Sequence, residues 1–591
     1  MRAHSRNGLI AAISPSGKLK RLIRATRFAL AMLAGLFSAP ALAIDNQYIV
    51  LCYHSVPERY NGDPMAVSAG NLAAQLSWLR AQGYTAISVS DVLKAKAGKI
   101  KLPAKSFMLT VDDGYHDFYT NAFPLLKMHK VPAVFAVVGK WIESGVPVGN
   151  EADPHFRKQR FVTWSQLREM ADSGLVEVAS HSYDLHHGIL ANPQGNTQPA
   201  AVTLRYNAAT RRYETVAERR LRIRDDLAHN SALIEHHLGK RPRVMVWPYG
   251  AHDRIGIEEA ARMGMPINLT LNAGAASASN SEIIPRALAD KEMPLGAFSY
   301  MVQSLQAPPK PSALRALTVN LDTLYHANAD VQNQNLGKLL DRVQDLGLNA
   351  VFLQPFARAR DGVIEQAYFP NTVLPMRADL ANRVAWQLRS RINVDVYAFM
   401  PTTNIAIAEK NKRRPLDAAN ERDRRKLLAL YEDFASHTPV RGVIFADGAS
   451  VTDFDKKLLA RVRYYRPPVQ PLYAGRVLAH ERASGAPNAI DAAGGEYRLA
   501  IVPAPLDRSD AQLKEFIAAQ PPGQVTILSL PVADLQTNSV QALARDVRAW
   551  QRHGLHHFVL DDARFLDDAT AVAALRQVLS LKHNPYLHVG Q

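Results

Sequence analysis

The chain is 591 residues long, carries a formal net charge of +16 and contains a single cysteine, Cys52. Its length exceeds what one compact domain accommodates, and the lone cysteine excludes an intrachain disulfide. No nucleic-acid-binding motif or dense basic helix accompanies the positive charge, so a nucleic-acid partner is not expected.

The first 43 residues have the pattern of a secretory signal. A basic stretch over residues 18–27 precedes an apolar run over 28–37, and Ala41-Leu42-Ala43 follows. The run is shorter than the ~20 apolar residues of a membrane span, and no other stretch approaches that length. We therefore predict a signal peptide over 1–43, cleavage after Ala43, and a soluble mature protein in the periplasm.

The predicted signal carries seven Lys and Arg and no acid, so the remainder has 63 basic against 54 acidic residues and a net charge of +9. That charge favours association with anionic lipid headgroups, here those of the outer membrane. Cys52 lies inside a predicted strand and not at the cleavage point, so lipid attachment is not expected. We expect a monomer.

Residues 44–305 alternate strands with helical stretches. The charged segment 214–237 is predicted to be an amphipathic helix. This alternation indicates an α/β fold, and we predict a distorted (β/α) barrel. The predicted strands lie near 48–54, 108–112, 133–138, 176–180, 244–247 and 266–271.

The second of these strands ends on Asp112-Asp113-Gly114. A turn at a strand end can direct both carboxylates toward one site. Hydrolysis at a metal needs such a pair, because one group holds the ion and another takes the proton. The alternative is a strand cap followed by a tight turn.

The strand near 176–180 runs into a histidine-rich turn, residues 181–187. His181 and His186 with Asp113 would form a two-histidine, one-carboxylate site that suits Zn, or Fe, Co and Ni. His187 is the competing ligand, and a solvated loop is the alternative reading.

A third strand closes on Trp247-Pro248-Tyr249-Gly250. A turn of this kind can aim a main-chain N–H, here that of Tyr249, at an oxyanion beside the metal. Taken alone, the same residues are only a turn.

With these three motifs the chain resembles the polysaccharide deacetylase family, carbohydrate esterase family four, whose motifs are Thr-Phe-Asp-Asp-Gly, a His-Ser-x-x-His element and Pro-Tyr-Gly in the same order. The resemblance implies that Asp112 is the general base and that Tyr249 supplies the oxyanion amide. It assigns the metal to Asp113, His181 and His186.

The spacing of five between His181 and His186 resembles the subfamily that deacetylates poly-β-1,6-N-acetyl-D-glucosamine, a biofilm exopolysaccharide. Cys52-Tyr53-His54 and Pro285-Arg286 resemble it too. The motifs of that subfamily are circularly permuted, which makes His54 the general acid; an imidazole titrates near working pH without a large shift. Tyr53, Tyr115, Trp247 and Tyr249 are candidate sugar-stacking side chains, with core packing as the alternative.

Residues 306–312 form a proline-rich linker before a second domain, 313–591. Eight predicted strands there indicate a closed (β/α)8 TIM-like barrel, whose active site would lie at the carboxyl ends of its strands. Those ends carry Asp322, Gln354, Met400, Asp447, Asp561 and Asp562. The strands are predicted over 317–321, 350–354, 394–400, 442–446, 471–474, 499–503, 525–530 and 557–560.

This domain resembles the glycoside-hydrolase-like barrel of the same deacetylases, above all over residues 351–401, which include Tyr368. The resemblance implies binding of partially deacetylated polymer, with Asp322, Gln354, Tyr368 and Asp447 as candidate contacts. Where relatives read Asp-Gly-x-x-Phe-His-Asp-Asp-Ala, residues 441–449 keep one aspartate, Asp447. Because glycosidases need two carboxylates, this departure favours binding over hydrolysis.

Three functions follow. The first is a metal-dependent N-deacetylase with a polymer-binding barrel, and the second adds an endo-glycosidase. The third is a non-catalytic adaptor for polysaccharide export. An outer-membrane export porin is the expected protein partner, and chitin oligomers or another amino-sugar polymer are alternative substrates.

Overall fold

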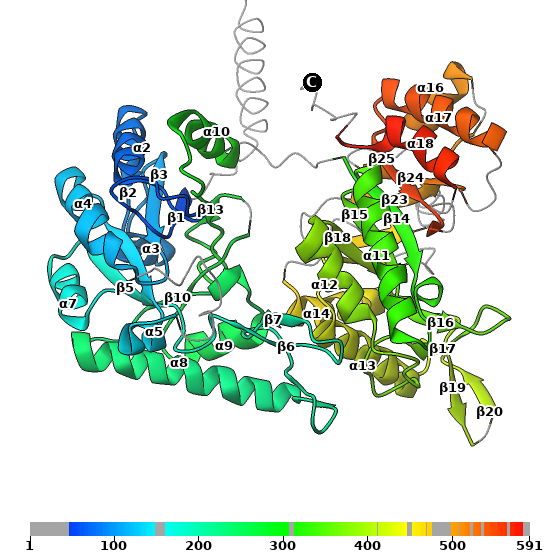
Figure 1. Ribbon diagram of the computed structural model, residues 1–591, viewed down its shortest axis with the longest axis horizontal. Helices are drawn as coiled ribbons and strands as arrows, with labels where there is room; N and C mark the ends of the chain where they lie inside the picture. Colours follow the sequence, from blue (N-terminus) through cyan, green and yellow to red (C-terminus); the bar gives the residue numbers. More distant parts are fainter. Residues whose placement is uncertain are drawn as a thin grey trace, which may run out of the picture.

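The computed structural model describes residues 46–147, 160–272, 274–306, 313–410, 412–445, 452–467, 470–474, 498–506, 509–519, 524–532, 537–563 and 568–582. The predicted signal, the linker after Gln306 and Asp447 lie outside the described residues. Figure 1 shows two α/β domains side by side, which we call the N-terminal domain (46–306) and the C-terminal domain (313–582). Within the described part, no helix is long and apolar enough to cross a bilayer.

The N-terminal domain is built on a sheet whose central strands are parallel, in the order β11-β10-β5-β4-β3-β1. Nearly all their side chains are buried, as expected for a sheet covered on both faces. These strands are β1 (Gln47–Tyr53), β3 (Ser106–Val111), β4 (Ala133–Val137), β5 (Val176–Ser180), β10 (Val244–Val246) and β11 (Ile267–Leu269).

One segment joins the two edges of this sheet. Ile284 bridges Leu269 of β11, and β13 (Ala287–Leu288) pairs in parallel with β1. The sheet therefore curves into a distorted barrel, as predicted. The shorter strands are β2 (Thr85–Ala86), which pairs with β3, and β12 (Ala276–Ser277), which is antiparallel to β1.

Helices of the N-terminal domain surround the sheet, and the predicted amphipathic helix is α8 (Val216–Leu238), which starts at a capping box of Thr215 with Glu218 and ends at Gly239. The others are α2 (Ala69–Ala81), α3 (Val89–Lys96), α4 (Phe123–His129), α5 (Gly139–Ser144), α7 (Trp164–Asp172), α9 (Arg254–Arg262) and α10 (Leu295–Gln306). Two hairpins extend from it, β6 (Gly188–Leu190) with β7 (Thr197–Pro199) and β8 (Tyr206–Asn207) with β9 (Arg212–Tyr213).

The C-terminal domain is a closed barrel of eight parallel strands, which confirms the predicted TIM-like class. Every predicted strand is present, including the fifth. In ring order they are β14 (Arg315–Asn320), β15 (Ala350–Gln354), β18 (Asp395–Phe399), β21 (Gly442–Phe445), β22 (Gln470–Ala474), β23 (Arg498–Pro503), β24 (Gln524–Leu530) and β25 (His557–Leu560).

Helices cover the outside of this barrel, and two hairpins, β16 (Phe356–Arg358) with β17 (Ile364–Ala367) and β19 (Ala406–Glu409) with β20 (Lys412–Pro415), project from it. The helices are α11 (Ala329–Leu346), α12 (Ala381–Ile392), α13 (Glu421–His437), α14 (Asp453–Tyr465), α16 (Asp510–Ala518), α17 (Thr537–Arg552) and α18 (Ala569–Leu579).

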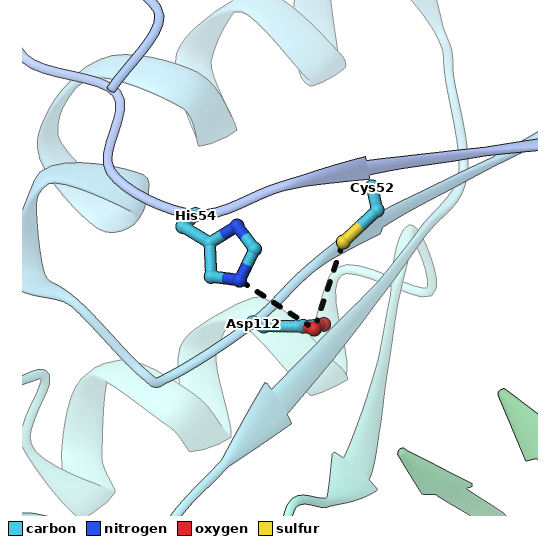
Figure 2. A group of neighbouring side chains, drawn as sticks. All are labelled: Cys52, His54 and Asp112. Atoms are coloured by element: carbon cyan, nitrogen blue, oxygen red, sulfur yellow. Dashed lines mark hydrogen bonds and ion pairs between the residues drawn. The ribbon is translucent and has the colours of Figure 1, made fainter. Parts of the chain in front are cut away.

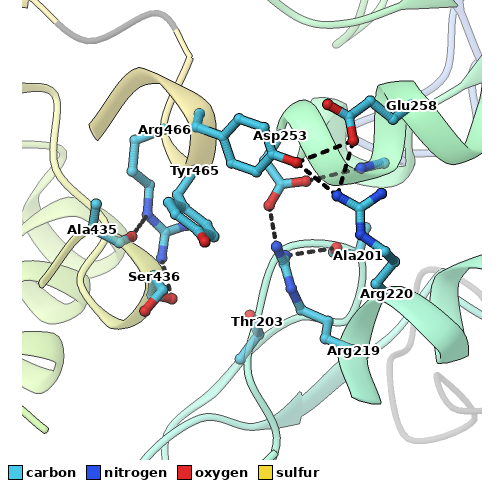
Figure 3. Close-up of polar contacts among 12 residues, drawn as sticks. Ala201, Thr203, Arg219, Arg220, Asp253, Glu258, Ala435, Ser436, Tyr465 and Arg466 are labelled. Carbon is cyan, nitrogen blue, oxygen red and sulfur yellow. Dashed lines mark hydrogen bonds and ion pairs between the residues drawn. The ribbon is translucent and has the colours of Figure 1, made fainter. Parts of the chain in front are cut away.

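Hydrogen bonds join the two domains along α8, α9 and the β6–β7 hairpin. Arg220 donates to the Tyr464 hydroxyl at 2.6 Å, and that hydroxyl donates to Glu258 at 3.0 Å. Figure 3 shows Arg220 and Glu258 beside the end of α14. Asn382 accepts from Gln198 at 2.7 Å within a buried cluster. Satisfied polar contacts that are partly or fully buried, as these are, favour one relative orientation.

Acid should weaken this interface through His437, whose ring lies 4.8 Å from that of Tyr213. Burial lowers the pKa of His437 from 6.5 to about 4. As the pH falls, this histidine is therefore protonated in the unfolded chain before it is protonated in the folded protein. The free energy of unfolding should fall by ~3 kcal/mol between pH 6.5 and pH 4. We expect the melting temperature, measured by calorimetry, to fall less for His437→Gln than for the parent between pH 7 and pH 4.5. An exposed control, His326→Gln, should behave as the parent; equal losses for His437→Gln and the parent would contradict the prediction.

Candidate active site

Four motifs meet at the carboxyl rim of the N-terminal barrel. His54 follows β1, Asp112 and Asp113 follow β3, His181 follows β5, and the turn around Tyr249 follows β10. Since β1 and β3 are neighbours, paired at Tyr53 and Val111, the side chains after them lie together. Parallel strands place their carboxyl ends at one rim, where ligands bind.

Asp113, His181 and His186 form a buried cluster that fits a metal ion. The Nε2 atoms of both histidines lie near Asp113 Oδ1, at 3.3 Å for His181 and 3.2 Å for His186. Ligand atoms that bind one ion at about 2.0–2.2 Å lie ~3.0–3.4 Å apart. The donor set of two imidazoles and one carboxylate suits Zn or Fe, Co and Ni.

Neighbouring groups orient the histidines. The Nδ1 atom of His181 lies 2.7 Å from the Val246 carbonyl oxygen, which can only accept, so Nδ1 carries the hydrogen and Nε2 is left as a ligand. Asp226 accepts the backbone N–H groups of Tyr183 and Asp184 at 2.9 and 2.7 Å and so holds the turn that carries His186.

His187, the competing ligand, points elsewhere. Its Nδ1 lies 3.6 Å from Asp184 Oδ1, and Asp184 is also paired with Lys140 at 2.6 Å. It is not among the three residues whose ligand atoms converge. The geometry therefore favours His186 as the second imidazole.

The carboxylate of Asp113 gives this cluster a negative charge that favours binding of a cation. Burial by itself raises the pKa of Asp113, but His186 and His181 outweigh it and hold that pKa well below its ordinary value. Asp113 is therefore ionised at neutral pH, and a buried carboxylate between two imidazoles attracts a cation.

Cys52, His54 and Asp112 form a second cluster beside the first, and Figure 2 shows these three side chains. The two oxygens of Asp112 accept from Arg286 at 2.8 Å each. Asp112 Oδ2 lies 3.9 Å from His54 Nε2 and 3.6 Å from the Cys52 sulfur. Burial raises the pKa of Asp112, but the charge of Arg286 prevails and lowers it, so the carboxylate is ionised. Because the Arg286 guanidinium already holds Asp112, we interpret His54 and Asp112 as an acid–base pair and not as part of a second metal site.

His54 is buried and held by its neighbours. Burial lowers its pKa from 6.5, against the opposing charges of Asp113 and Asp112. Asp117 accepts from the Ser55 hydroxyl at 2.6 Å and from the backbone N–H of Val56 at 3.0 Å, which fixes the chain just after His54. An imidazole held next to a carboxylate can deliver a proton.

The rim carries unusual backbone conformations. Three non-glycine residues have positive φ there: Asp113 at 76°, Ser182 at 73° and Tyr249 at 58°. Such conformations cost free energy and persist where surrounding structure enforces them, often at functional sites. In this chain each one turns the backbone immediately beyond a strand that carries a site residue.

Gly250 is required at this rim. Its φ is +66°, and an added Cβ would lie 2.8 Å from the Leu271 backbone nitrogen. We expect Gly250→Ala to lower the free energy of unfolding by about 2–5 kcal/mol, from left-handed backbone plus overlap. The matched control Gly98→Ala has φ +69° with open space around it and should cost only about 1–2 kcal/mol. Urea unfolding of both variants checks this, and equal losses would contradict it.

Three of the four candidate sugar-stacking side chains instead pack in the core, which was the alternative reading. Tyr53, Tyr115 and Trp247 are fully buried, and the Tyr53 hydroxyl donates to Gln75 at 2.7 Å. Rings packed into the core cannot stack on a sugar. Tyr249 differs, because its side chain is 45% exposed and its ring lies 4.5 Å from that of His186.

The carboxyl end of the C-terminal barrel holds three other predicted contacts, Asp322, Gln354 and Tyr368, which lie within the described residues. Asp322 accepts from the Tyr368 hydroxyl at 2.6 Å and pairs with Arg377 at 3.1 Å. Tyr368 is fully buried, so its predicted role as a sugar contact is wrong, and it positions Asp322 instead. Gln354 lines a cavity of about 350 Å³ with Asp561 at this end.

Three supporting residues were not assigned roles from the sequence. They are Arg286, which holds the base; Asp117, which fixes the chain after His54; and Asp226, which holds the histidine turn. Pro285-Arg286 was visible as a matching motif, but nothing in it located the partner. Asp117 and Asp226 both accept backbone N–H groups, a contact that leaves no sequence pattern.

Comparisons with known proteins agree with this arrangement. A family model described as Polysaccharide deacetylase matches residues 99–267. A second, described as Hypothetical glycosyl hydrolase family 13, matches residues 318–469. The two models thus fall on the two barrels.

Two similar proteins share one name. The poly-β-1,6-N-acetyl-D-glucosamine N-deacetylase of Escherichia coli (strain K12) is 35% identical over 444 residues, covering 71% of this chain and 65% of the relative. A protein of that name from Staphylococcus aureus (strain MSSA476) is 23% identical over 239 residues, covering 40% of this chain and 71% of the relative. The BpsB deacetylase domain from Bordetella bronchiseptica, a solved structure, is 41% identical with a TM-score of 0.38, covering 42% of this chain and 98% of that chain.

The chain spans slightly less than two thirds of the length of the Escherichia coli relative. The resemblance predicted from the motifs is confirmed by these matches. The chain is accordingly similar to the poly-β-1,6-N-acetyl-D-glucosamine N-deacetylases, with a region that matches the polysaccharide deacetylase model followed by one that matches the glycosyl hydrolase model.

Proposed function

We propose that this protein is a metal-dependent hydrolase that removes N-acetyl groups from poly-β-1,6-N-acetyl-D-glucosamine during export of a biofilm exopolysaccharide. One observation carries the proposal: a three-donor metal cluster and a carboxylate–imidazole pair share one barrel rim. The names of the similar proteins supply the polymer.

The residues divide the reaction between them. Asp113, His181 and His186 would hold a divalent ion, which would supply polarisation of the acetyl carbonyl and a lowered pKa for water. Asp112 takes the proton from the attacking water, and Arg286 keeps this carboxylate ionised and oriented.

Two further groups complete the turnover. The main-chain N–H of Tyr249 donates a hydrogen bond to the oxyanion that forms at the former carbonyl. His54 gives a proton to the departing amine nitrogen as the carbon–nitrogen bond breaks. The products are acetate and a glucosamine unit. One water molecule is consumed, and its oxygen enters the acetate.

The C-terminal barrel has a binding role in this proposal. Its carboxyl-end cavity is polar and carries Asp561 and Asp562, whose charge suits the ammonium groups of partially deacetylated polymer. The signal pattern of the sequence supports a periplasmic location, where an export porin of the same system is the partner. The donor set supports Zn, or Fe, Co and Ni, as the ion.

Acetate release from β-1,6-linked N-acetylglucosamine oligomers by metal-loaded protein tests the proposal, with the products sized by mass spectrometry. We expect acetate without shortening of the oligomer. Shortening of the deacetylated product would show a glycosidase in addition. Absence of acetate from metal-loaded protein would overturn the proposal in favour of an export adaptor.

A further inference from the structure

A cavity of about 450 Å³ lies between the two domains, a volume typical of small-ligand sites. One wall comes from the N-terminal domain and includes Tyr249, His252 and Asn272. The other comes from α12, the end of α14 with the residues just beyond it, and the residues preceding or beginning β18 and β21. The cavity therefore faces the amino end of the C-terminal barrel. It is distinct from the barrel's carboxyl-end cavity, which Gln354 and Asp561 line.

Tyr249 connects this cavity to the active site. Its ring lies 4.5 Å from the ring of the metal-binding candidate His186, and the same residue lines the cavity. Gly250, Ala251 and His252 continue the lining from there. A polymer with one sugar at the metal would have its next sugars within reach of this space.

The walls suit a sugar. Trp386, on α12, lines the cavity and is only partly buried, and an aromatic side chain in such a wall can stack on a pyranose. His252 Nδ1 lies 2.8 Å from the Gly250 carbonyl oxygen and must donate to it, which leaves Nε2 as an acceptor. Among the described residues that buried Nε2 has no hydrogen-bond partner. A sugar hydroxyl can satisfy it.

The charge of the walls is positive. Arg389, Arg441 and Arg466 line the cavity against one acid, Asp395. Burial lowers the pKa of Arg466 to about 10, so its guanidinium remains charged at neutral pH. Its nitrogen atoms donate to backbone carbonyls at the end of α13 and just beyond, and Figure 3 shows it beside Ala435 and Ser436. Backbone carbonyls carry no net charge, so these hydrogen bonds hold the guanidinium without cancelling its charge.

We propose that the interdomain cavity is a binding subsite for an uncharged, N-acetylated stretch of the polymer, next to the unit being deacetylated. Trp386 stacks on a sugar ring, and the arginines repel the ammonium of glucosamine. The inference rests on the proposed function and adds a direction to it. Acetylated polymer occupies the interdomain side, whereas the deacetylated product is directed away from it.

Binding to a non-hydrolysing protein tests the subsite. In an Asp112→Asn background, calorimetric titration would compare a fully acetylated β-1,6-linked pentamer with the same pentamer fully deacetylated. We expect Trp386→Ala to weaken binding of the acetylated pentamer about tenfold, as for loss of an aromatic anchor. Unchanged affinity in this variant, with a parent-like circular dichroism spectrum, would overturn the stacking role.

A charge reversal tests selectivity on an exposed position. Arg389→Glu should reduce the preference for acetylated over deacetylated pentamer about three- to tenfold. Arg391→Glu makes the same charge change on the same helix, outside the cavity lining, and should retain the preference. Equal effects of the two variants, or none from Arg389→Glu, would overturn the charge selection. If the wild type releases no acetate, the proposed function fails, whereas these binding differences still report on the cavity.

Discussion

Asp113→Ala should lose its bound metal ion, and its kcat for acetate release should fall at least about 10³-fold. Asp113 Oδ1 is the atom on which both imidazoles converge, at 3.3 and 3.2 Å, so its removal leaves two ligands that lack the anionic charge between them. An ion in such a site contributes several kcal/mol of charge stabilisation in the transition state, and each factor of ten corresponds to about 1.4 kcal/mol. The measurement is metal content by mass spectrometry after desalting, together with acetate release.

The matched control is Asp184→Ala. Asp184 lies in the same histidine turn and is partly exposed, but it pairs with Lys140 and His187 and contributes no atom to the cluster. This variant should keep its metal and most of its activity. An Asp113→Ala protein that retains stoichiometric metal would show that the three residues are not the metal site.

The strands of both barrels were predictable because parallel strands buried on both faces give short, nearly continuous apolar runs. β15 was predicted over 350–354 and is Ala350–Gln354; β25 was predicted over 557–560 and is His557–Leu560. The barrel seam, which is the segment that joins the two edges of the N-terminal sheet, was not predicted. It depends on Ile284 and the two-residue strand β13, pieces too short to give a periodic signal.

The metal cluster was predictable for a related reason. Each ligand follows directly after a buried strand or lies in the turn beyond it, so finding the strands also located Asp113, His181 and His186 at one rim. The order of the residues in the chain gave no distances. Only the structure separates His186, which joins the cluster, from His187, which faces Asp184.

Side-chain direction was the part that sequence could not supply. Tyr53, the last residue of β1, adjoins His54, but successive side chains of a strand point to opposite faces. Trp247 lies just beyond β10, and its indole N–H donates to the buried Asn268 at 3.0 Å. Both therefore lie in the core, although tyrosine and tryptophan are also the residues that stack on sugars. Likewise the partner of Asp112, Arg286, is distant along the chain and is brought in by the barrel seam.

Asp112→Asn should reduce kcat about 10²- to 10⁴-fold while the protein keeps its metal, because loss of a general base removes proton transfer but no ligand. The amide that replaces the carboxylate can still accept a hydrogen bond from Arg286, so the side chain stays in place, yet its oxygen cannot take a proton from water. Acetate release and metal content, measured on the same preparation, separate this variant from Asp113→Ala.

The control for this change is Asp253→Asn, which alters another buried aspartate paired with a buried arginine, Arg219. Removing a buried carboxylate from such a pair destabilises a protein by about 3–5 kcal/mol whether or not it is catalytic. Asp253→Asn should therefore melt at a lower temperature but keep the kcat of its folded fraction, since it lies outside the rim. If Asp112→Asn lost activity only in proportion to its unfolded fraction, as Asp253→Asn should, then Asp112 would be a structural partner of Arg286 and the base would have to be sought elsewhere at the rim.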